Sequence, residues 1–268
     1  MTIAEWLMPA MIRLRNAGVD SPRRDCLVLL EDTIQKDRAW VVAHPEYELD
    51  QKVIQTLDKL IARRANREPL AYIRGRTWFY GRFFEVNHNV LIPRPESENF
   101  IGLLKDLAPQ KIIDIGTGSG ALAITAKLEL PGSKIIATDT SSAALAIAQK
   151  NAASYKVDIQ FVSGDLISAL SDEQLKDSVV IANLPYVPEK LITSPEITQE
   201  PAEALFSGPD GLEHYKRFWQ QLTMPAHKPT YVLVESLESQ HPAIESLAQN
   251  AGYKLDKADM LIQQFILK

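Results

Sequence analysis

The sequence has few of the features that mark secreted, membrane or metal-cluster proteins. Its single cysteine, Cys26, lies within the apolar run "CLVLL", so no intrachain disulfide and no thiolate metal cluster can form. No apolar run reaches the roughly 20 residues that a membrane-spanning helix needs, and charged side chains interrupt the N-terminal stretch "MTIAEWLMPAMIRLR". We therefore expect a cytoplasmic protein without membrane contact.

Positive charge is also in short supply. The chain has 29 lysines and arginines against 34 aspartates and glutamates, giving a formal net charge of −5. This balance disfavours nucleic acid as the main partner, because protein surfaces that bind nucleic acid are basic. The five histidines show no metal-ligand spacing, so His88 and His214 are interpreted as surface residues and no metal is predicted.

Strand signals are nearly absent from residues 1–75. Apolar residues there recur three and four positions apart within 3–14, 26–34 and 53–61, which predicts helices. The following stretch, "TWFYGRFFEV", has two aromatic runs around Gly81-Arg82 and is typical of a β-hairpin. We therefore predict a helical domain over 1–75, a hairpin linker over 76–92 and a second domain over 93–268, which begins with a helix at 95–107.

The second domain alternates short apolar runs with helical patterns. The predicted strands are "KIIDI", "KIIAT", "DIQFV", "SVVIA" and "TYVLVE", followed by "GYKLDK" and "LIQQFILK" as an antiparallel pair. This alternation indicates βαβ units, and hence an α/β fold with a mostly parallel sheet. The proline-rich stretch 187–211 is predicted to be a long loop, and such loops in compact domains are usually functional.

A glycine-rich loop, "DIGTGSGALAI", follows the first predicted strand. Its glycines let the backbone turn sharply and approach a ligand at a helix N-terminus. The pattern also fits the dinucleotide fingerprint, so the glycines alone leave both a nicotinamide cofactor and S-adenosylmethionine open. The candidate cofactor-binding residues of this loop are Gly116, Thr117, Gly118, Ser119 and Gly120.

Two acidic residues follow the next two predicted strands. Asp139 lies about 20 residues beyond the glycines, where a carboxylate can accept hydrogen bonds from ribose hydroxyls. It could instead cap the next helix, although Thr140 and Ser141 already offer that chemistry. Asp165, followed by Leu166, is predicted to lie beside the adenine, with a plain turn as the alternative.

The stretch "IANLPYVPEK" places Asn183 after the fourth predicted strand, at the point where ligands bind in doubly wound sheets. An asparagine oxygen and a neighbouring main-chain carbonyl are two acceptors, which suits a substrate nitrogen that carries two N–H donors. Tyr186 can pack flat against such a planar group, and Pro185 stiffens the turn. The alternative is an Asx turn that does no chemistry.

With these motifs the chain resembles class I S-adenosylmethionine-dependent methyltransferases that modify planar nitrogens through an Asn-Pro-Pro-Tyr motif. Within that group it is similar to the release-factor glutamine methyltransferases, the PrmC/HemK family. The resemblance rests on "REPLAYIRG", "WFYGRFFEV", "LIPRPESE", "DIGTGSGA", "NLPYVP", "EPAEAL", "DGLEHY" and "ESLESQ", which occur in this order along essentially the whole chain.

The resemblance implies a Rossmann-like domain with a seven-stranded, mostly parallel sheet whose last strand is antiparallel, joined by a β-hairpin to an N-terminal helical bundle that recognises the substrate. It implies S-adenosylmethionine as cofactor and, as substrate, the glutamine of the Gly-Gly-Gln motif in peptide chain release factors. We expect a monomer without direct contact to nucleic acid. The residues that the resemblance assigns to catalysis and substrate binding are Asn183, Leu184, Pro185 and Tyr186, with Asn183 also touching the cofactor, and Arg94, Pro95 and Glu96 as lining residues.

Two positions depart from the family pattern. Leu184 replaces the first proline of the Asn-Pro-Pro-Tyr motif, and Leu237 replaces a glycine after the fifth strand of the parallel sheet. Leucine also has a main-chain carbonyl, so the chemistry can survive with some loss of rigidity. Asn-Leu-Pro-Tyr also resembles the motif of ribosomal-RNA adenine dimethyltransferases. The alternatives are therefore an adenine-N6 methyltransferase acting on RNA or DNA, a non-catalytic nucleotide-binding module, and a nicotinamide dehydrogenase.

Overall fold

The computed structural model describes residues 1–191 and 194–268 and contains two compact units. The first comprises Met1–Gly75 together with the six residues Ser194–Gln199. The second comprises the described residues between Arg76 and Thr193 and the segment Glu200–Lys268. Each unit has a hydrophobic core of its own.

The first unit is built from helices, as its apolar spacing predicts. Thr2 begins the first helix in a capping box with Glu5, which satisfies main-chain donors at that end. Trp6, Cys26 and Leu57 are among the side chains that form the core, so the single cysteine is a buried core residue. The helices are α1 (Ile3–Asn16), α2 (Pro22–Ile34), α3 (Arg38–Ala43), α4 (Gln51–Ala65) and α5 (Leu70–Arg74).

An ion-pair network binds the distant segment Ser194–Gln199 into the first unit. Glu196 accepts from Arg64 at 2.9 Å and from Arg67 at 2.5 Å. Arg64 also donates to the fully buried carboxylate of Asp25 at 2.8 Å. A buried carboxylate and a buried guanidinium are stable only when they are paired, so Glu196 completes a network that the helices begin. The sequence predicts a loop at Glu196 but not the unit to which it binds.

The second unit contains the predicted hairpin and a seven-stranded sheet. The hairpin pairs β1 (Arg76–Phe79) with β2 (Arg82–Glu85). The sheet order is β5-β4-β3-β6-β7-β9-β8, in which β3 to β7 are parallel and β9 is antiparallel to both of its neighbours. These strands are β3 (Lys111–Ile115), β4 (Lys134–Asp139), β5 (Gln160–Ser163), β6 (Val179–Ala182), β7 (Tyr231–Glu235), β8 (Tyr253–Asp259) and β9 (Ile262–Leu267).

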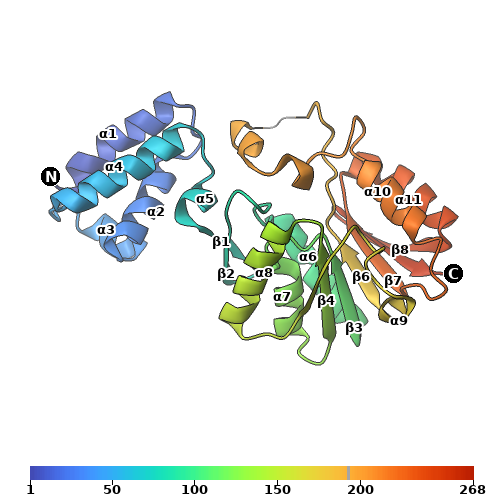
Figure 1. The fold of residues 1–268 in the computed structure, drawn as a ribbon. Coiled ribbons are helices and arrows are strands. Elements are labelled where there is room, and N and C mark those ends of the chain that lie inside the picture. Colours follow the sequence, from blue (N-terminus) through green and yellow to red (C-terminus); the bar gives the residue numbers. More distant parts are fainter. Residues whose placement is uncertain (192–193) are drawn as a thin grey trace. The chain divides into compact units, whose positions relative to one another are not determined.

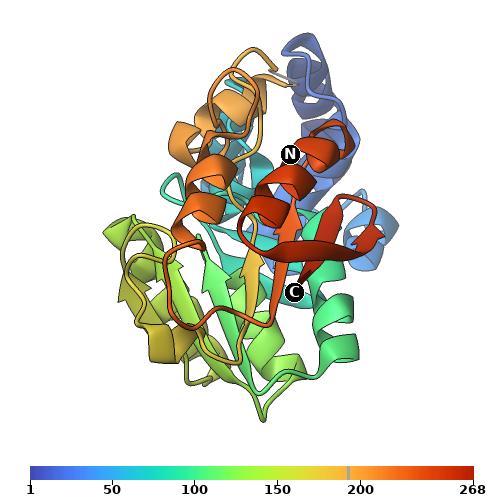
Figure 2. The same cartoon turned by 90° about the vertical axis from the view of Figure 1, so that its right-hand side faces the viewer.

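Helices cover both faces of this sheet, which explains why its central strands are continuous apolar runs. Ile113 and Val180 face a core that includes side chains of α10 (Glu213–Gln221) and α11 (His241–Asn250). Ile112 and Ile181 face the opposite core, which α6 (Asn99–Leu107), α7 (Ala121–Glu129) and α8 (Ser142–Tyr155) help to form. Figure 1 shows the two helical layers, and Figure 2 shows β8 and β9, in red, at one edge of the sheet.

Some local elements differ from the sequence prediction. The helix expected at 95–107 begins as a 3₁₀ turn, η1 (Pro95–Glu98), before α6 continues it, and α9 (Asp172–Leu175), between β5 and β6, has only four residues. The long loop contains two 3₁₀ turns, η2 (Pro195–Gln199) and η3 (Ala202–Ala204), and η4 (Glu238–Gln240) precedes α11.

Within residues 1–191 and 194–268, we find no helix with the length and apolar character that a bilayer crossing requires.

Candidate active site

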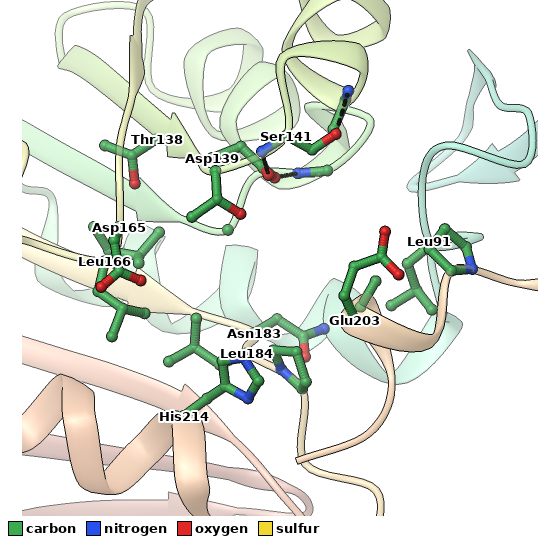
Figure 3. Close-up of a pocket in the computed structure, with 18 of the residues that line it drawn as sticks. Leu91, Thr138, Asp139, Ser141, Asp165, Leu166, Asn183, Leu184, Glu203 and His214 are labelled. Atoms are coloured by element: carbon green, nitrogen blue, oxygen red, sulfur yellow. Dashed lines mark hydrogen bonds between the residues drawn. The ribbon is translucent and has the colours of Figure 1, made fainter.

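A cavity of about 220 Å³ lies at the carboxyl ends of strands β3, β4 and β6, within the second unit. This is the edge at which ligands bind in doubly wound sheets. Figure 3 shows Asp139, Asp165, Asn183 and His214 around it. Its wall is formed by Asn89, Val90, Leu91, Ile115, Gly116, Gly118, Thr138, Asp139, Thr140, Ser141, Ala144, Gly164, Asp165, Leu166, Asn183, Leu184, Pro185, Pro201, Glu203, Ala204, His214 and Arg217.

The glycine loop, residues Gly116–Gly120, joins β3 to α7, and the buried acid Asp114 holds it through a hydrogen bond. Thr117 donates its hydroxyl to Asp114 at 2.7 Å. Asp114 is 1% exposed, and burial, the largest effect, raises the pKa of its carboxyl to about 7. At Gly118, φ is +55° and a Cβ would meet no atom within 4 Å, so the glycine leaves the space above the loop clear.

Asp139 ends β4 and holds the glycine loop against the next helix. Its carboxylate accepts from the Gly118 N–H and the Ser141 N–H, both at 2.9 Å (Figure 3). Burial raises the pKa of Asp139, and these main-chain donors oppose the rise. Ser141 caps α8 by accepting from Ala144, so Asp139 is not the side-chain cap of that helix. A carboxylate has about four acceptor positions, so it can still accept from a ligand.

Asp165 and Leu166 follow β5, the strand that pairs with β4, and both line the cavity. Arg217 of α10 donates to Asp165 at 2.5 Å, so the carboxylate is already paired in this structure. Leu166 is buried and supplies an apolar surface. His214, expected at the surface, instead lines the cavity, where its ring pairs with the Ser207 hydroxyl at 2.8 Å. Burial and the nearby Arg217 lower its pKa.

These residues fit the adenosine half of a nucleoside cofactor. The cavity has a glycine floor at Gly118, an anionic end at Asp139 and an apolar wall at Leu166. The hydroxyl of Thr138 is buried at the cavity and has no hydrogen-bond partner among the described residues, so a ligand could satisfy it. The described residues contain no group of three or more histidine, cysteine or acidic side chains that could hold a metal ion.

The Asn-Leu-Pro-Tyr turn, residues Asn183–Tyr186, follows β6 at the other side of the cavity. Asn183 donates its Nδ2 to the buried hydroxyl of Ser97 at 2.8 Å. Because the nitrogen is engaged, Oδ1 is the atom left to accept from a substrate. The fully buried Tyr215 supports the turn, since its hydroxyl lies against the Ala182 carbonyl and accepts from the Leu184 N–H at 3.4 Å.

Tyr186 is held by Glu235, the last residue of β7, and by Gln240 of η4. Its hydroxyl donates to Glu235 at 3.0 Å, and its main-chain carbonyl accepts from Gln240 at 2.9 Å. Burial and the Glu235 carboxylate raise the pKa of the Tyr186 hydroxyl, so it stays protonated. The ring is therefore a neutral, fixed surface and not a proton acceptor.

The predicted substrate segment, Arg94 to Glu96, begins η1 and lies next to Ser97. Arg94 pairs with Glu200 at 2.5 Å, and Glu200 also accepts from the Ile92 N–H at 3.0 Å. Glu200, in "EPAEAL", therefore anchors the segment. None of the residues from Arg94 to Glu96 is part of the cavity wall.

The structure brings eight of the predicted site residues to the cavity and leaves others beside it. The eight are Gly116, Gly118, Asp139, Asp165, Leu166, Asn183, Leu184 and Pro185. Thr117, Ser119, Gly120 and Tyr186 belong to the same loop or turn but do not form the wall. Thr138, next to Asp139 at a strand end, could have been predicted from its position. His214 and Arg217 could not, because no local pattern marks a residue that only the tertiary fold brings to the cavity.

Two family models match the chain. The first is the PrmC N-terminal domain, over residues 5–75, and the second is the methyltransferase small domain, over residues 96–208. Among curated proteins, the release factor glutamine methyltransferase of Staphylococcus aureus is 38% identical over 253 residues, which is 92% of this chain and 90% of that protein. The release factor glutamine methyltransferase of Caulobacter vibrioides is 33% identical over 261 residues, which is 94% of this chain and 90% of that protein.

Solved structures show the same fold at low identity. The hMettl16 catalytic domain in complex with MAT2A 3′UTR hairpin 6 matches with a TM-score of 0.54 at 14% identity, covering 81% of each chain. A methyltransferase from Pyrococcus furiosus matches with a TM-score of 0.50 at 17% identity, covering 70% of this chain and 88% of that one. At such identities the likeness concerns the fold alone.

Proposed function

Because this chain belongs to the release factor glutamine methyltransferase family, we propose that it transfers a methyl group from S-adenosyl-L-methionine to the side-chain amide nitrogen (N5) of the glutamine in the Gly-Gly-Gln motif of a peptide chain release factor. One observation carries the proposal: the Asn183 amide, tied through its nitrogen to Ser97, lies at the cavity that Gly118 and Asp139 border. An acceptor for a substrate N–H and a nucleoside site are thus adjacent.

The cofactor fits the cavity through residues already placed there. Asp139 would accept from the ribose hydroxyls, and Asp165 and Leu166 would border the adenine. When bound, S-adenosylmethionine supplies a methyl group on a sulfonium, so transfer forms one N–C bond, breaks one S–C bond and releases one proton from the amide nitrogen. The chain's part is to bind, orient and exclude water.

The Asn-Leu-Pro-Tyr turn would orient the glutamine. The amide nitrogen donates one N–H to Asn183 Oδ1 and the other to the Leu184 carbonyl, which fixes its direction of attack. The Tyr186 ring packs against the amide plane and keeps water away. Arg94, Pro95 and Glu96 would contact the substrate backbone beside the turn. No strong base is needed, because positioning supplies the main part of the acceleration.

A direct test follows the methyl group. Purified protein, labelled cofactor and an unmodified release factor are incubated, and the product is digested and analysed by mass spectrometry. We expect a single added methyl on the glutamine of Gly-Gly-Gln. A release factor with asparagine in place of that glutamine is the matched control. Transfer of label to RNA, with the release factor left unmodified, would refute the proposal.

We also propose that residues 1–75 recognise the release factor, with 76–92 as linker and 93–268 as the methyltransferase domain. A folded protein substrate needs a docking surface beyond the chemical pocket, and the PrmC N-terminal domain model matches this region. Hydrogen exchange on the full chain tests the role. We expect slower exchange within residues 1–75 when the release factor is added. Unchanged exchange there, with slowing at the Asn-Leu-Pro-Tyr turn, would assign recognition to the second unit.

The comparisons do not favour the alternatives of an adenine-N6 methyltransferase or a non-catalytic nucleotide-binding module. We further propose a cytoplasmic monomer that contacts protein and neither nucleic acid nor membrane. The net charge of −5 supports this, because polyanionic surfaces would repel the chain. Light scattering should give a mass near the 30.0 kDa of one chain, and twice that mass would show a dimer.

A further inference from the structure

The last residue of β7, Glu235, is a fully buried carboxylate at the back of the Asn-Leu-Pro-Tyr turn. Its Oε1 accepts from the Tyr186 hydroxyl at 3.0 Å. Its Oε2 is buried and has no hydrogen-bond partner within the described part of the chain. A carboxylate in this setting costs stability, and burial accordingly raises its pKa. Such a group in a native core calls for a reason other than packing.

Glu235 faces both halves of the turn. Ser97 and Asn183 lie close enough to its carboxyl to lower its pKa, against the larger effect of burial. Ser97 is also the residue that accepts from the Asn183 amide nitrogen. Tyr186 is therefore bonded to this carboxylate directly, whereas Asn183 is bonded to Ser97, and both Ser97 and Asn183 lower the pKa of the same carboxylate.

Gln240, five positions after Glu235, fixes the main chain of the same turn. Its Nε2 donates to the carbonyls of Tyr186 and Asp210, both at 2.9 Å, and its Oε1 accepts from the Leu237 N–H at 3.0 Å. Gly211 permits this close approach. Its φ is +74°, and a Cβ there would lie 2.2 Å from the Tyr186 carbonyl oxygen. Tyr186 is thus held at its ring hydroxyl and at its main chain by residues of one short segment.

We infer that Glu235 is a positioning residue for methyl transfer, which fixes the Asn183 amide and the Tyr186 ring relative to each other, while Gln240 holds the main chain between them. The inference rests on the proposed function, since it concerns the same site. It gives the "ESLESQ" segment a specific role. It also predicts that Leu237, which departs from the family glycine, is tolerated because the segment acts through Glu235, Gln240 and the Leu237 main-chain N–H.

A double-mutant cycle on the full chain tests the inference. The variants are Glu235→Gln, Tyr186→Phe and the two combined, each assayed for kcat on the release factor at saturating S-adenosylmethionine. We expect Glu235→Gln to lower kcat by about tenfold, on the order of one well-placed hydrogen bond. Because Glu235 acts partly through the Tyr186 hydroxyl, the double variant should be less impaired than the product of the two single effects.

Two further measurements separate positioning from a general loss of structure. The dissociation constant for S-adenosylmethionine should stay within about twofold of the parent in each variant, since Glu235 does not line the cavity. Ser236→Ala is the matched control. Its buried hydroxyl has no partner among the residues described, and it neighbours Glu235, so its kcat should equal that of the parent.

Ser97→Ala keeps the test informative if Glu235→Gln does not fold. It removes the acceptor of the Asn183 amide and leaves Glu235 and its hydrogen bond to Tyr186 in place, and we expect a lower kcat with unchanged cofactor affinity. Parental kcat in Ser97→Ala, or in folded Glu235→Gln, would overturn the inference while leaving the proposed function intact. Fully multiplicative effects in the cycle would also overturn it. No methylation by the parent enzyme would refute the proposed function and the inference together.

Discussion

The glycine loop and the Asn-Leu-Pro-Tyr turn border the same cavity but are held in different ways. The loop depends on near neighbours in the sequence: Asp114 lies three positions from Thr117, and Asp139 lies 21 positions from Gly118. The turn depends on distant residues, since Ser97 is 86 positions from Asn183 and Glu235 is 49 from Tyr186. One βαβ unit can therefore shape the loop, whereas the turn is correct only when the whole sheet has assembled.

This difference predicts two separable kinds of defect. Substitutions around the glycine loop should weaken cofactor binding, because they act on the nucleoside side of the cavity. Substitutions around the turn should slow transfer at saturating cofactor, because they act on the orientation of the substrate. The following experiments test whether the two regions are independent.

The largest effect is expected for Asn183→Ala. The change removes one of the two proposed acceptors of the glutamine nitrogen and leaves Ser97 without its donor. Loss of such positioning costs on the order of a hundredfold in turnover. Turnover is measured at saturating cofactor, because Asn183 is also predicted to touch the cofactor and its loss can weaken cofactor binding. A folded variant with parental turnover would reduce the Asn-Leu-Pro-Tyr turn to a structural feature.

Asp139→Ala should have the next largest effect, this time on binding. Charge-assisted hydrogen bonds to the ribose contribute about 1.5–3 kcal/mol, so the dissociation constant for S-adenosylmethionine should rise roughly 10- to 100-fold. The matched control is Asp158→Ala, an exposed acid before β5, which should bind as the parent does. An unchanged constant in Asp139→Ala would remove this residue from the cofactor site.

The same contrast explains what the sequence alone could predict. Buried parallel strands are continuous apolar runs, and the glycine loop and Asp139 follow such runs directly, so the fold and the place of these residues at the sheet edge were predictable. The helices of the first unit and the seven-stranded sheet are confirmed. His214 was wrongly placed at the surface, because a single residue of an amphipathic helix carries no local sign that its face borders a cavity. Ser97, Glu235 and Gln240 were missed as supports because their bonds to the turn join residues 49 to 86 positions apart in the sequence.

Leu184→Pro should have a small effect on turnover. It restores the family residue and keeps the main-chain carbonyl, but it removes the N–H that Tyr215 accepts at 3.4 Å. A hydrogen bond of that length contributes little, so turnover should stay within about tenfold of the parent, provided Asn183 adopts the extended backbone required before proline. Abolished activity in a folded Leu184→Pro protein would contradict the proposed role of the carbonyl.

The last experiment concerns stability and the buried acid that holds the glycine loop. Because burial raises the pKa of Asp114 from 3.8 to about 7, the folded state binds its proton more tightly than the unfolded chain does. The tighter proton binding stabilises the folded state. This stabilisation is complete below pH 3.8 and is lost as the pH rises through about 7. Asp114→Asn, which keeps an acceptor for Thr117, should therefore show a flatter pH dependence of the free energy of unfolding. Urea titrations between pH 4 and 7.5 would show it, and parallel curves would contradict it.

The membership of Ser194–Gln199 in the first unit bears on how this protein can be dissected or recombined. The chain passes between the units after Gly75, again before Ser194 and again after Gln199. A protease cut at residue 75 would therefore leave the first unit bound by Glu196 to the rest of the chain. For the same reason, a chimaera that exchanges only residues 1–75 would bring in a helical bundle without its matching six residues. An exchange that preserves the ion-pair network must therefore transplant both pieces.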